Sequence, residues 1–123
     1  DYKHAIFHQP NGKFPLKMAK DLGFSKEQVE TGLLTPHIGN TYSGAVPLGL
    51  AAVLEVSKPG EKVFVISYGS GAGSDGFDIE ITDAIESYDR SAAPTLKQLI
   101  ANTREIDYAT YAKYRDMIKL RGD

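Results

Sequence analysis

The sequence predicts an α/β fold in which a mixed β-sheet is layered between helices. The run Val63–Ile66 is apolar and rich in β-branched residues, which is typical of a strand covered on both faces. The segment Ser43–Val56 has a single charge and is apolar nearly all round, as a buried helix is. The expected elements follow one another as strand, helix, helix, strand and strand. That order favours helices packed on a sheet whose strands run in both directions.

The first third of the chain is expected to contain one strand and two helices. A short apolar strand at Ala5–Phe7 runs directly into turn-forming residues. Over Phe14–Leu22, apolar residues alternate with lysines at near-helical spacing, which predicts an amphipathic helix with a basic face. Ser25, followed by acidic and amide residues, is a capping signal for a second, short helix over Lys26–Thr31. We expect the next segment, Leu34–Asn40, to be a loop.

The second half continues with two strands and ends in helices. The buried helix leads through a turn at Pro59–Lys62 to the apolar strand. A glycine-rich loop, Gly69–Ser74, follows, and Gly76–Ile81 then alternates apolar and polar residues as a half-exposed strand does. The tail predicts helices at Leu96–Ala101 and Asp107–Leu120.

Three tyrosines on the last expected helix are spaced by three residues: Tyr108, Tyr111 and Tyr114. An aromatic stripe at this spacing usually packs against a neighbouring element, so we expect these residues to be structural and assign them no chemistry.

The composition is that of an ordinary soluble protein, with 123 residues and a net charge of −2 from mixed acids and bases. This charge gives no reason to expect nucleic acid or an acidic membrane surface as a partner. No apolar run approaches the roughly 18 residues of a membrane span, and the N-terminus lacks a signal-peptide pattern, so we expect a cytoplasmic location. The absence of cysteine excludes disulfides, thiolate metal sites and a cysteine nucleophile within these residues, and we expect no metal site.

Polar residues gather in three loops, each at the end of a buried element. The loops are His8–Asn11, Gly39–Ser43 and Ser67–Gly71. Taken singly, each has an ordinary structural interpretation: a hydrogen-bonded histidine, an asparagine that caps a turn, and glycines that supply positive φ. Only the three together indicate a function.

Taken together, the three loops resemble the C-terminal half of the thiolase superfamily of condensing enzymes. In that superfamily the histidine of a His-Gln-x-Asn motif follows a strand, and the asparagine of a Gly-Asn-Thr motif precedes the buried helix. A glycine-rich loop completes the site. This chain has His8-Gln9-Pro10-Asn11 and Gly39-Asn40-Thr41 in the same order. The resemblance runs from about residue 1 to 82. It implies that residues 1–83 are the C-terminal catalytic segment of a thiolase-like fold, and that residues 84–123 are a helical extension packed on the same domain.

The third loop distinguishes branches of the superfamily. Chain-initiating ketoacyl synthases usually have Phe-Gly-Gly-Gly where this chain has Tyr68-Gly69-Ser70-Gly71, which looks like hydroxymethylglutaryl-CoA synthase of the archaeal and bacterial type. Tyr42 and His8-Gln9-Pro10 also resemble the Gly-Asn-x-Tyr and His-x-Pro patterns of those synthases. Thiolases fit worse, because they have a second catalytic cysteine before their last glycine loop. The resemblance implies condensation of acetyl-CoA with acetoacetyl-CoA and water to 3-hydroxy-3-methylglutaryl-CoA, in the mevalonate pathway of isoprenoid synthesis.

The same resemblance implies roles for individual residues. His8 and Asn40 are expected to contact the second substrate: an imidazole can donate a proton to the ketone oxygen of acetoacetyl-CoA, and an amide can orient the substrate or the histidine. Ser70 is expected to offer its backbone N–H to the thioester oxygen, with its hydroxyl secondary. The residues expected to line the substrate site with them are Tyr42, Gly69 and Gly71.

The basic face of the first helix has two interpretations. It is either an ordinary solvated surface or a contact for the phosphates of coenzyme A, which suit the point charges of lysines. For the second interpretation we choose Lys13 and Lys17. On either interpretation the expected substrates are coenzyme A thioesters, and we expect no cofactor.

The family also uses catalytic residues that this chain lacks, and their absence leads to further predictions. Hydroxymethylglutaryl-CoA synthases use a cysteine nucleophile and a glutamate base from the N-terminal half. This chain contains neither, so we expect it to be inactive alone. The chain would be a truncated piece, a proteolytic remnant or one chain of a split enzyme, and a partner would cover an otherwise open sheet edge and apolar face. The family implies a homodimer, and in archaea an assembly with acetoacetyl-CoA thiolase and a small OB-fold protein.

Two other functions remain open. A chain-initiating ketoacyl synthase of the fatty acid type would share His8 and Asn40 but condense with an acyl carrier protein. A non-catalytic scaffold derived from half of a condensing enzyme is favoured only by the absent cysteine.

Overall fold

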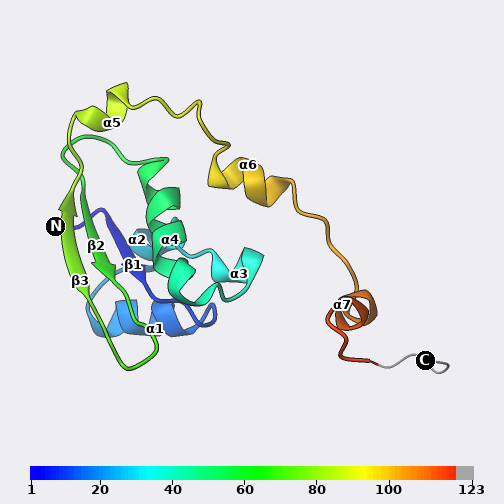
Figure 1. Ribbon diagram of the computed structural model, residues 1–123. Coiled ribbons are helices and arrows are strands. Elements are labelled where there is room, and N and C mark those ends of the chain that lie inside the picture. The colour runs from blue at the N-terminus through cyan, green and yellow to red at the C-terminus, as the bar shows by residue number, and fades with distance from the viewer. Residues whose placement is uncertain (119–123) are drawn as a thin grey trace.

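The computed structural model describes residues 1–118, which contain a three-stranded sheet (Figure 1). The strands β1 (His4–Phe7), β2 (Lys62–Ile66) and β3 (Gly76–Glu80) lie in the order β1-β2-β3. β1 runs parallel to β2, and β3 runs antiparallel to β2. The predicted mixed sheet is therefore confirmed.

Helices cover both faces of this sheet (Figure 1). The helices α1 (Phe14–Asp21) and α2 (Lys26–Glu30) pack on one face, and α4 (Ala45–Leu54) packs on the other. The remaining helices of the described residues lie in connections and in the tail: α3 (Thr35–Ile38), the 3-10 helix η1 (Tyr42–Gly44), α5 (Ala84–Ser87), α6 (Leu96–Ala101) and α7 (Tyr108–Tyr114). The predicted α/β class, with the sheet layered between helices, is confirmed.

Alternating side chains of the strands form a hydrophobic core on each face, because successive residues of a strand point to opposite sides. The core on the α4 face consists of Ile6, Val46, Val53, Val63, Val65 and Ile81. The core on the α1 and α2 face consists of Ala5, Phe7, Ala19 and Val29, with Phe64 and Ile66 packed against them. Both cores include β1, so the end of this strand is held rigidly from two sides.

Gly49 lets α4 approach both β1 and the segment after α2 closely. A Cβ atom on Gly49 would lie 2.9 Å from the carbonyl oxygen of Gly32 and 3.0 Å from Cγ2 of Ile6, so neither neighbour leaves room for a side chain. This contact fixes the first half of α4 against the end of β1.

Two sequence predictions about helices are wrong. The expected loop Leu34–Asn40 contains α3, a single turn that has Pro36 at its start and ends at Gly39, where φ is +76°. The last helix, α7, ends at Tyr114 instead of reaching Leu120. The end of that prediction, residues 119–120, lies outside the described residues.

The tyrosine stripe does not pack as expected. Tyr108, Tyr111 and Tyr114 are 72%, 44% and 75% exposed. Figure 1 shows α7 apart from the sheet and its helices, at the end of an extended segment, whereas α6 packs against α4. The spacing of three places the rings on one side of a helix, but no described element covers that side.

The predicted division of the chain into residues 1–83 and a helical extension, residues 84–123, stays a prediction.

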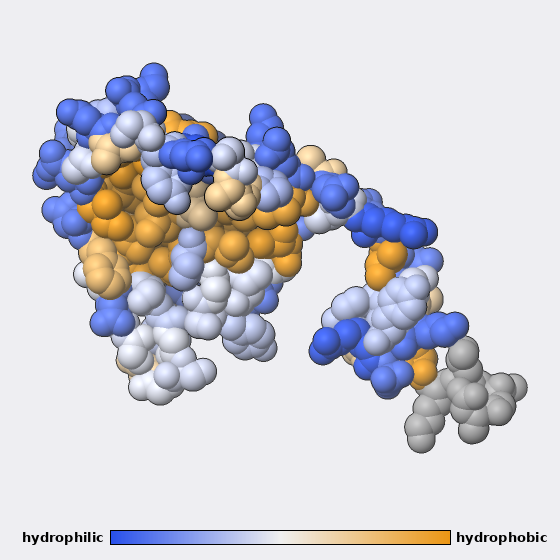
Figure 2. Space-filling view, turned by 45° about the horizontal axis from the view of Figure 1, so that its top comes forward, coloured by the Kyte–Doolittle hydropathy of each residue, from blue (hydrophilic) through white to orange (hydrophobic). Residues whose placement is uncertain are grey.

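The face of the molecule that contains α4 is hydrophobic on its outside. Figure 2 shows a broad hydrophobic area there. Leu50 and Leu54 of α4 are only partly buried, and Val56, just after the helix, is 56% exposed. Among the described residues, no helix is long and apolar enough to span a membrane.

His4, at the start of β1, makes stability depend on pH. It is buried, and its Nδ1 atom has no hydrogen-bond partner among the described residues. Burial lowers the pKa of His4 below 6.5; nearby Glu61 opposes this shift and Lys3 adds to it. Because the unfolded chain then binds a proton more readily than the folded chain, we expect the free energy of unfolding to be highest above about pH 6.5. It should fall as the pH drops from there towards the folded pKa.

Urea unfolding at about pH 7.5 and about pH 5 measures this change. A His4→Leu variant removes the titrating group and should reduce the difference between the two conditions. An undiminished difference in the variant would mean that other groups cause it.

Candidate active site

The three loops identified from the sequence lie at the same end of the sheet (Figure 1). Because β1 and β2 are parallel, the segments that follow them leave at one edge, and the backbone N–H of His8 donates to the carbonyl oxygen of Ile66 at 3.1 Å. The second loop joins them because α4 begins at this end: the Gln9 side chain reaches the carbonyl oxygen of Ala45 at 3.5 Å. The structure thus brings together segments from the beginning, middle and end of residues 1–80.

His8 is half-buried and lies beside the third loop. The centroid of its ring is 5.9 Å from that of Tyr68, with the ring planes tilted by 50°. Tyr68 is 51% exposed. Because His8 is only half-buried, it has both this aromatic neighbour and access to solvent.

Asn40 is exposed and organises the second loop. Its Oδ1 accepts a hydrogen bond from the backbone N–H of Tyr42 at 2.8 Å. This contact supports Tyr42 in a left-handed conformation, with φ of +53°, and the tyrosine ring is 76% exposed. The Nδ2 group of Asn40 donates to no other described residue, so it is free to donate to a ligand.

The third loop is closed by its own hydrogen bonds. The N–H of Ser67 donates to the carbonyl of Asp75, and that of Gly69 to the carbonyl of Gly73, both at 2.9 Å. Gly71 has φ of +89°, a conformation that favours glycine. Ser70, between Gly69 and Gly71, is exposed, and its backbone N–H makes no backbone hydrogen bond within the described part of the chain.

A cavity of about 490 Å³ lies beside His8, on the face of the sheet that α1 covers. It is lined by Phe7, His8, Pro10, Phe14, Met18, Leu22, Ile66, Tyr68 and Ser74. The side chain of Asn11 accepts from the backbone N–H groups of Lys13 and Phe14, each at 2.9 Å, and so fixes the start of α1 at the edge of this cavity.

The two lysines chosen from the sequence differ in their surroundings. Lys17 forms an ion pair with Asp21 at 2.9 Å, one helical turn further on, and both side chains are largely exposed. Lys13 is exposed at the first turn of α1 and makes no ion pair with another described residue. Lys13 is therefore the better placed of the two to meet an anionic ligand.

Gln9 belongs to the site as well, although it was not predicted from the sequence. Its side chain is 2% exposed and forms hydrogen bonds to the segments that begin α3 and α4. The available signal was a polar residue directly after a fully apolar strand, since a buried amide must find partners. The partners themselves lie 23 to 36 residues away in the sequence.

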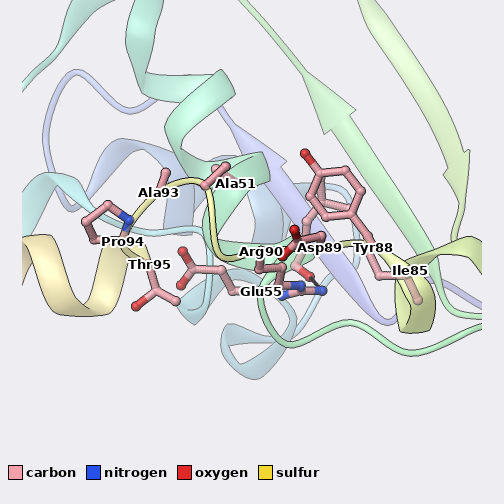
Figure 3. Close-up of a pocket in the computed structure, with 11 residues that line it drawn as sticks. Ala51, Glu55, Ile85, Tyr88, Asp89, Arg90, Ala93, Pro94 and Thr95 are labelled. Carbon is pink, nitrogen blue, oxygen red and sulfur yellow. Dashed lines mark hydrogen bonds between the residues drawn. The ribbon is translucent and has the colours of Figure 1, made fainter.

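A second cavity, of about 380 Å³, lies at the opposite end of α4 (Figure 3). It is bounded by Ala51, Glu55 and the segment from Ile85 to Thr95, in which Arg90 donates to the carbonyl of Leu54 at 2.9 Å. No residue predicted for the site lines it. Within residues 1–118, no group of three or more His, Asp or Glu side chains is arranged to hold a metal ion.

Comparisons with known proteins identify relatives of the chain. The family described as 3-oxoacyl-[acyl-carrier-protein (ACP)] synthase III C terminal matches residues 1–80. The chain is 57% identical over 118 residues to a hydroxymethylglutaryl-CoA synthase of Thermoplasma acidophilum, with 96% of this chain and 34% of the relative covered. Similar relatives with the same name come from Thermoplasma volcanium, at 55% identity with 100% and 35% covered, and from Methanothermobacter thermautotrophicus, at 57% with 98% and 34% covered.

These matches confirm the resemblance to hydroxymethylglutaryl-CoA synthases. They include the tail as well as the site loops, since up to the whole chain is covered. The chain spans about a third of the length of the curated relatives it matches.

Proposed function

This chain belongs to the family of the 3-oxoacyl-[acyl-carrier-protein] synthase III C-terminal domain, and we propose that it is the part of a hydroxymethylglutaryl-CoA synthase that receives acetoacetyl-CoA. The observation that supports this most is the meeting of three loops, with His8 beside Tyr68 and the Asn40 loop at the same end. The reaction would join acetyl-CoA, acetoacetyl-CoA and water to give 3-hydroxy-3-methylglutaryl-CoA and free coenzyme A.

The proposed chemistry divides into three steps. An acetyl group passes from acetyl-CoA to a cysteine thiolate, with loss of coenzyme A. The acetyl methyl group then loses a proton to a base, and its carbon attacks the ketone carbon of acetoacetyl-CoA, whose oxygen gains a proton. Water finally cleaves the thioester to the cysteine, which releases the product and restores the thiolate.

His8 and Asn40 would act in the second step. His8 has solvent access and would donate the proton that the ketone oxygen gains as it becomes a tertiary alcohol. The free Nδ2 group of Asn40 would donate a hydrogen bond to the same substrate without gaining or losing a proton. The exposed ring of Tyr42, whose conformation Asn40 supports, would line one side of the acetoacetyl site.

Ser70 would act where the acyl thioester is made and broken. Ser70 is exposed, and its backbone N–H lies between two glycines, whose lack of a side chain lets the main chain approach a thioester oxygen. One such donor typically contributes about 10²–10³ in rate.

The cysteine nucleophile and the glutamate base would belong to the rest of the protein, outside this chain. The broad hydrophobic area on the α4 face supports this, because a surface of this kind is normally covered by another part of a protein. We accordingly propose that these residues alone are inactive, and that the whole protein is a homodimer that assembles with acetoacetyl-CoA thiolase and a small OB-fold protein.

The test uses the full-length protein with acetyl-CoA and acetoacetyl-CoA, and follows both the coenzyme A released and the product formed. Coenzyme A release that depends on both substrates supports the proposal. Condensation of an acetyl group with a malonyl thioester instead would favour the ketoacyl synthase alternative, which the name of the matching family suggests. An absence of any acyl transfer would favour the scaffold alternative.

Lys13 gives a separate prediction about coenzyme A. We expect Lys13→Ala to weaken coenzyme A binding about fivefold at low salt, from roughly 1 kcal/mol for one solvent-exposed charge pair. The effect should shrink as salt is raised, because salt screens the attraction. Binding measured by titration calorimetry over a series of salt concentrations checks both parts.

The matched control is Lys26→Ala, which removes another exposed helical lysine, one paired with Glu30 on α2 at 2.9 Å. The control should bind coenzyme A as the unchanged protein does. Equal affinities of the Lys13 and Lys26 variants would show that the basic face of α1 is only a solvated surface.

A further inference from the structure

We propose that Gln9 is a positioning residue that sets His8 and the Asn40 loop in their relative places for condensation. The inference rests on the proposed function and extends it to a residue that would touch no substrate. Gln9 directly follows His8 in the chain, so any force that fixes Gln9 also fixes the backbone of the histidine.

The side chain of Gln9 is buried and uses both ends of its amide. Nε2 donates to the carbonyl of Gly32 at 2.7 Å. Oε1 accepts from the backbone N–H groups of Leu34 at 2.7 Å and Thr35 at 2.9 Å. The hydroxyl of Thr35 donates to the backbone carbonyl of Gln9 at 2.7 Å and also lies 3.1 Å from its Oε1. One amide therefore ties the end of β1 to the segment that begins α3.

The same amide reaches the other end of the Asn40 segment. Nε2 of Gln9 lies 3.5 Å from the carbonyl of Ala45, the first residue of α4. The residues between Thr35 and Ala45 form α3, the Asn40 turn and η1. Gln9 thus contacts both ends of the segment that contains Asn40. This geometry links the position of Asn40 to that of His8.

Two side chains of similar length show why an amide fits this arrangement. A carboxylate of the same length would accept from Leu34 and Thr35 but repel the carbonyls of Gly32 and Ala45. Methionine would fill the same volume and leave buried N–H and C=O groups without partners, which they would seek by moving. A shift of about 1 Å in a catalytic group can cost about 10²-fold in rate.

A glutamine elsewhere in the chain provides a matched control. Gln28 also joins distant segments: its Nε2 donates to the carbonyl of Tyr2 at 2.6 Å, and its Oε1 accepts from the N–H of Ser25 at 2.8 Å. Its contact is at the opposite end of β1 from His8. Gln28→Met removes two hydrogen bonds of a partly buried glutamine without touching the three loops.

The experiment compares Gln9→Met and Gln28→Met in the full-length protein. Labelled acetyl-CoA counts the sites that become acetylated, and rapid mixing with acetoacetyl-CoA then measures condensation per acetylated site. We expect a fall of about 10- to 100-fold for Gln9→Met and less than about twofold for Gln28→Met. A merely structural residue would reduce the number of acetylated sites and leave the rate per site unchanged. That result for Gln9→Met would overturn the inference.

A milder variant keeps the test decisive if Gln9→Met does not fold. Thr35→Val preserves the shape of the side chain and removes only the hydroxyl that bonds to Gln9. We expect condensation per acetylated site to fall about 3- to 10-fold; an unchanged rate would count against the inference. Failure of the unchanged protein to become acetylated, or to condense with acetoacetyl-CoA, would instead reject the proposed function.

Discussion

His8→Ala is expected to slow condensation with acetoacetyl-CoA by about 10²–10⁴-fold while leaving acetylation of the full-length protein intact. The reason is the division of labour proposed for the site. Acetylation makes a thioester at a cysteine outside these residues, whereas condensation turns a ketone oxygen into an alcohol and needs a proton donor. His8 is the histidine at the meeting point of the three loops, half-buried and 5.9 Å from the ring of Tyr68.

Measurement of the two steps separately makes this prediction specific. Labelled acetyl-CoA reports the first step, and product formation from the acetylated protein reports the second. His37→Ala is the matched control, because His37 is an exposed histidine on α3 and lines neither described cavity. A His8 variant that condenses at the rate of the His37 variant would remove His8 from the chemistry. A His8 variant that is no longer acetylated would assign it to the first step.

The sequence identified three loops at the ends of buried elements, and the structure brings these loops to one end of the sheet. His8 and Tyr68 follow the apolar ends of β1 and β2, and parallel strands lead their following segments to the same end of a sheet. The asparagine loop precedes α4, which packs on the sheet. The predicted strands and the buried helix between them are confirmed, because those predictions needed only the periodicity of the strands and the hydrophobicity of the helix.

The predictions that failed needed contacts between distant residues. Pro36 and Gly39 suggest a loop, yet together they enclose one helical turn, whose first residues are bonded to Gln9. The spacing of the tyrosines of α7 defines one side of a helix, but says nothing about whether another element covers it. Gln9 was missed for the same reason, since its partners Gly32 and Ala45 are close only in the folded chain.

Asn40→Asp is expected to slow condensation by about 10²–10³-fold, the typical effect of losing one donor to an oxyanion. The structural interpretation of Asn40 as a turn residue is supported by its bond to Tyr42 at 2.8 Å, and that bond uses only Oδ1. Aspartate keeps this acceptor, so the turn and the left-handed conformation of Tyr42 should persist. It replaces the Nδ2 donor with a negative oxygen, which would repel the alkoxide that forms on the substrate.

Comparison with Asn40→Ala separates the two functions of the side chain. Alanine removes both the acceptor and the donor, so it should slow condensation and also lower the free energy of unfolding by about 1 kcal/mol. Condensation measured per acetylated site, together with urea unfolding, gives both quantities for each variant. If Asn40 only caps a turn, the aspartate variant will match the unchanged protein in rate and stability, and only alanine will differ. If Asn40 holds the substrate, the two variants will share the loss of rate, and alanine alone will be destabilised. The contrast depends on one feature of the structure: the turn engages one end of this amide and leaves the other end free.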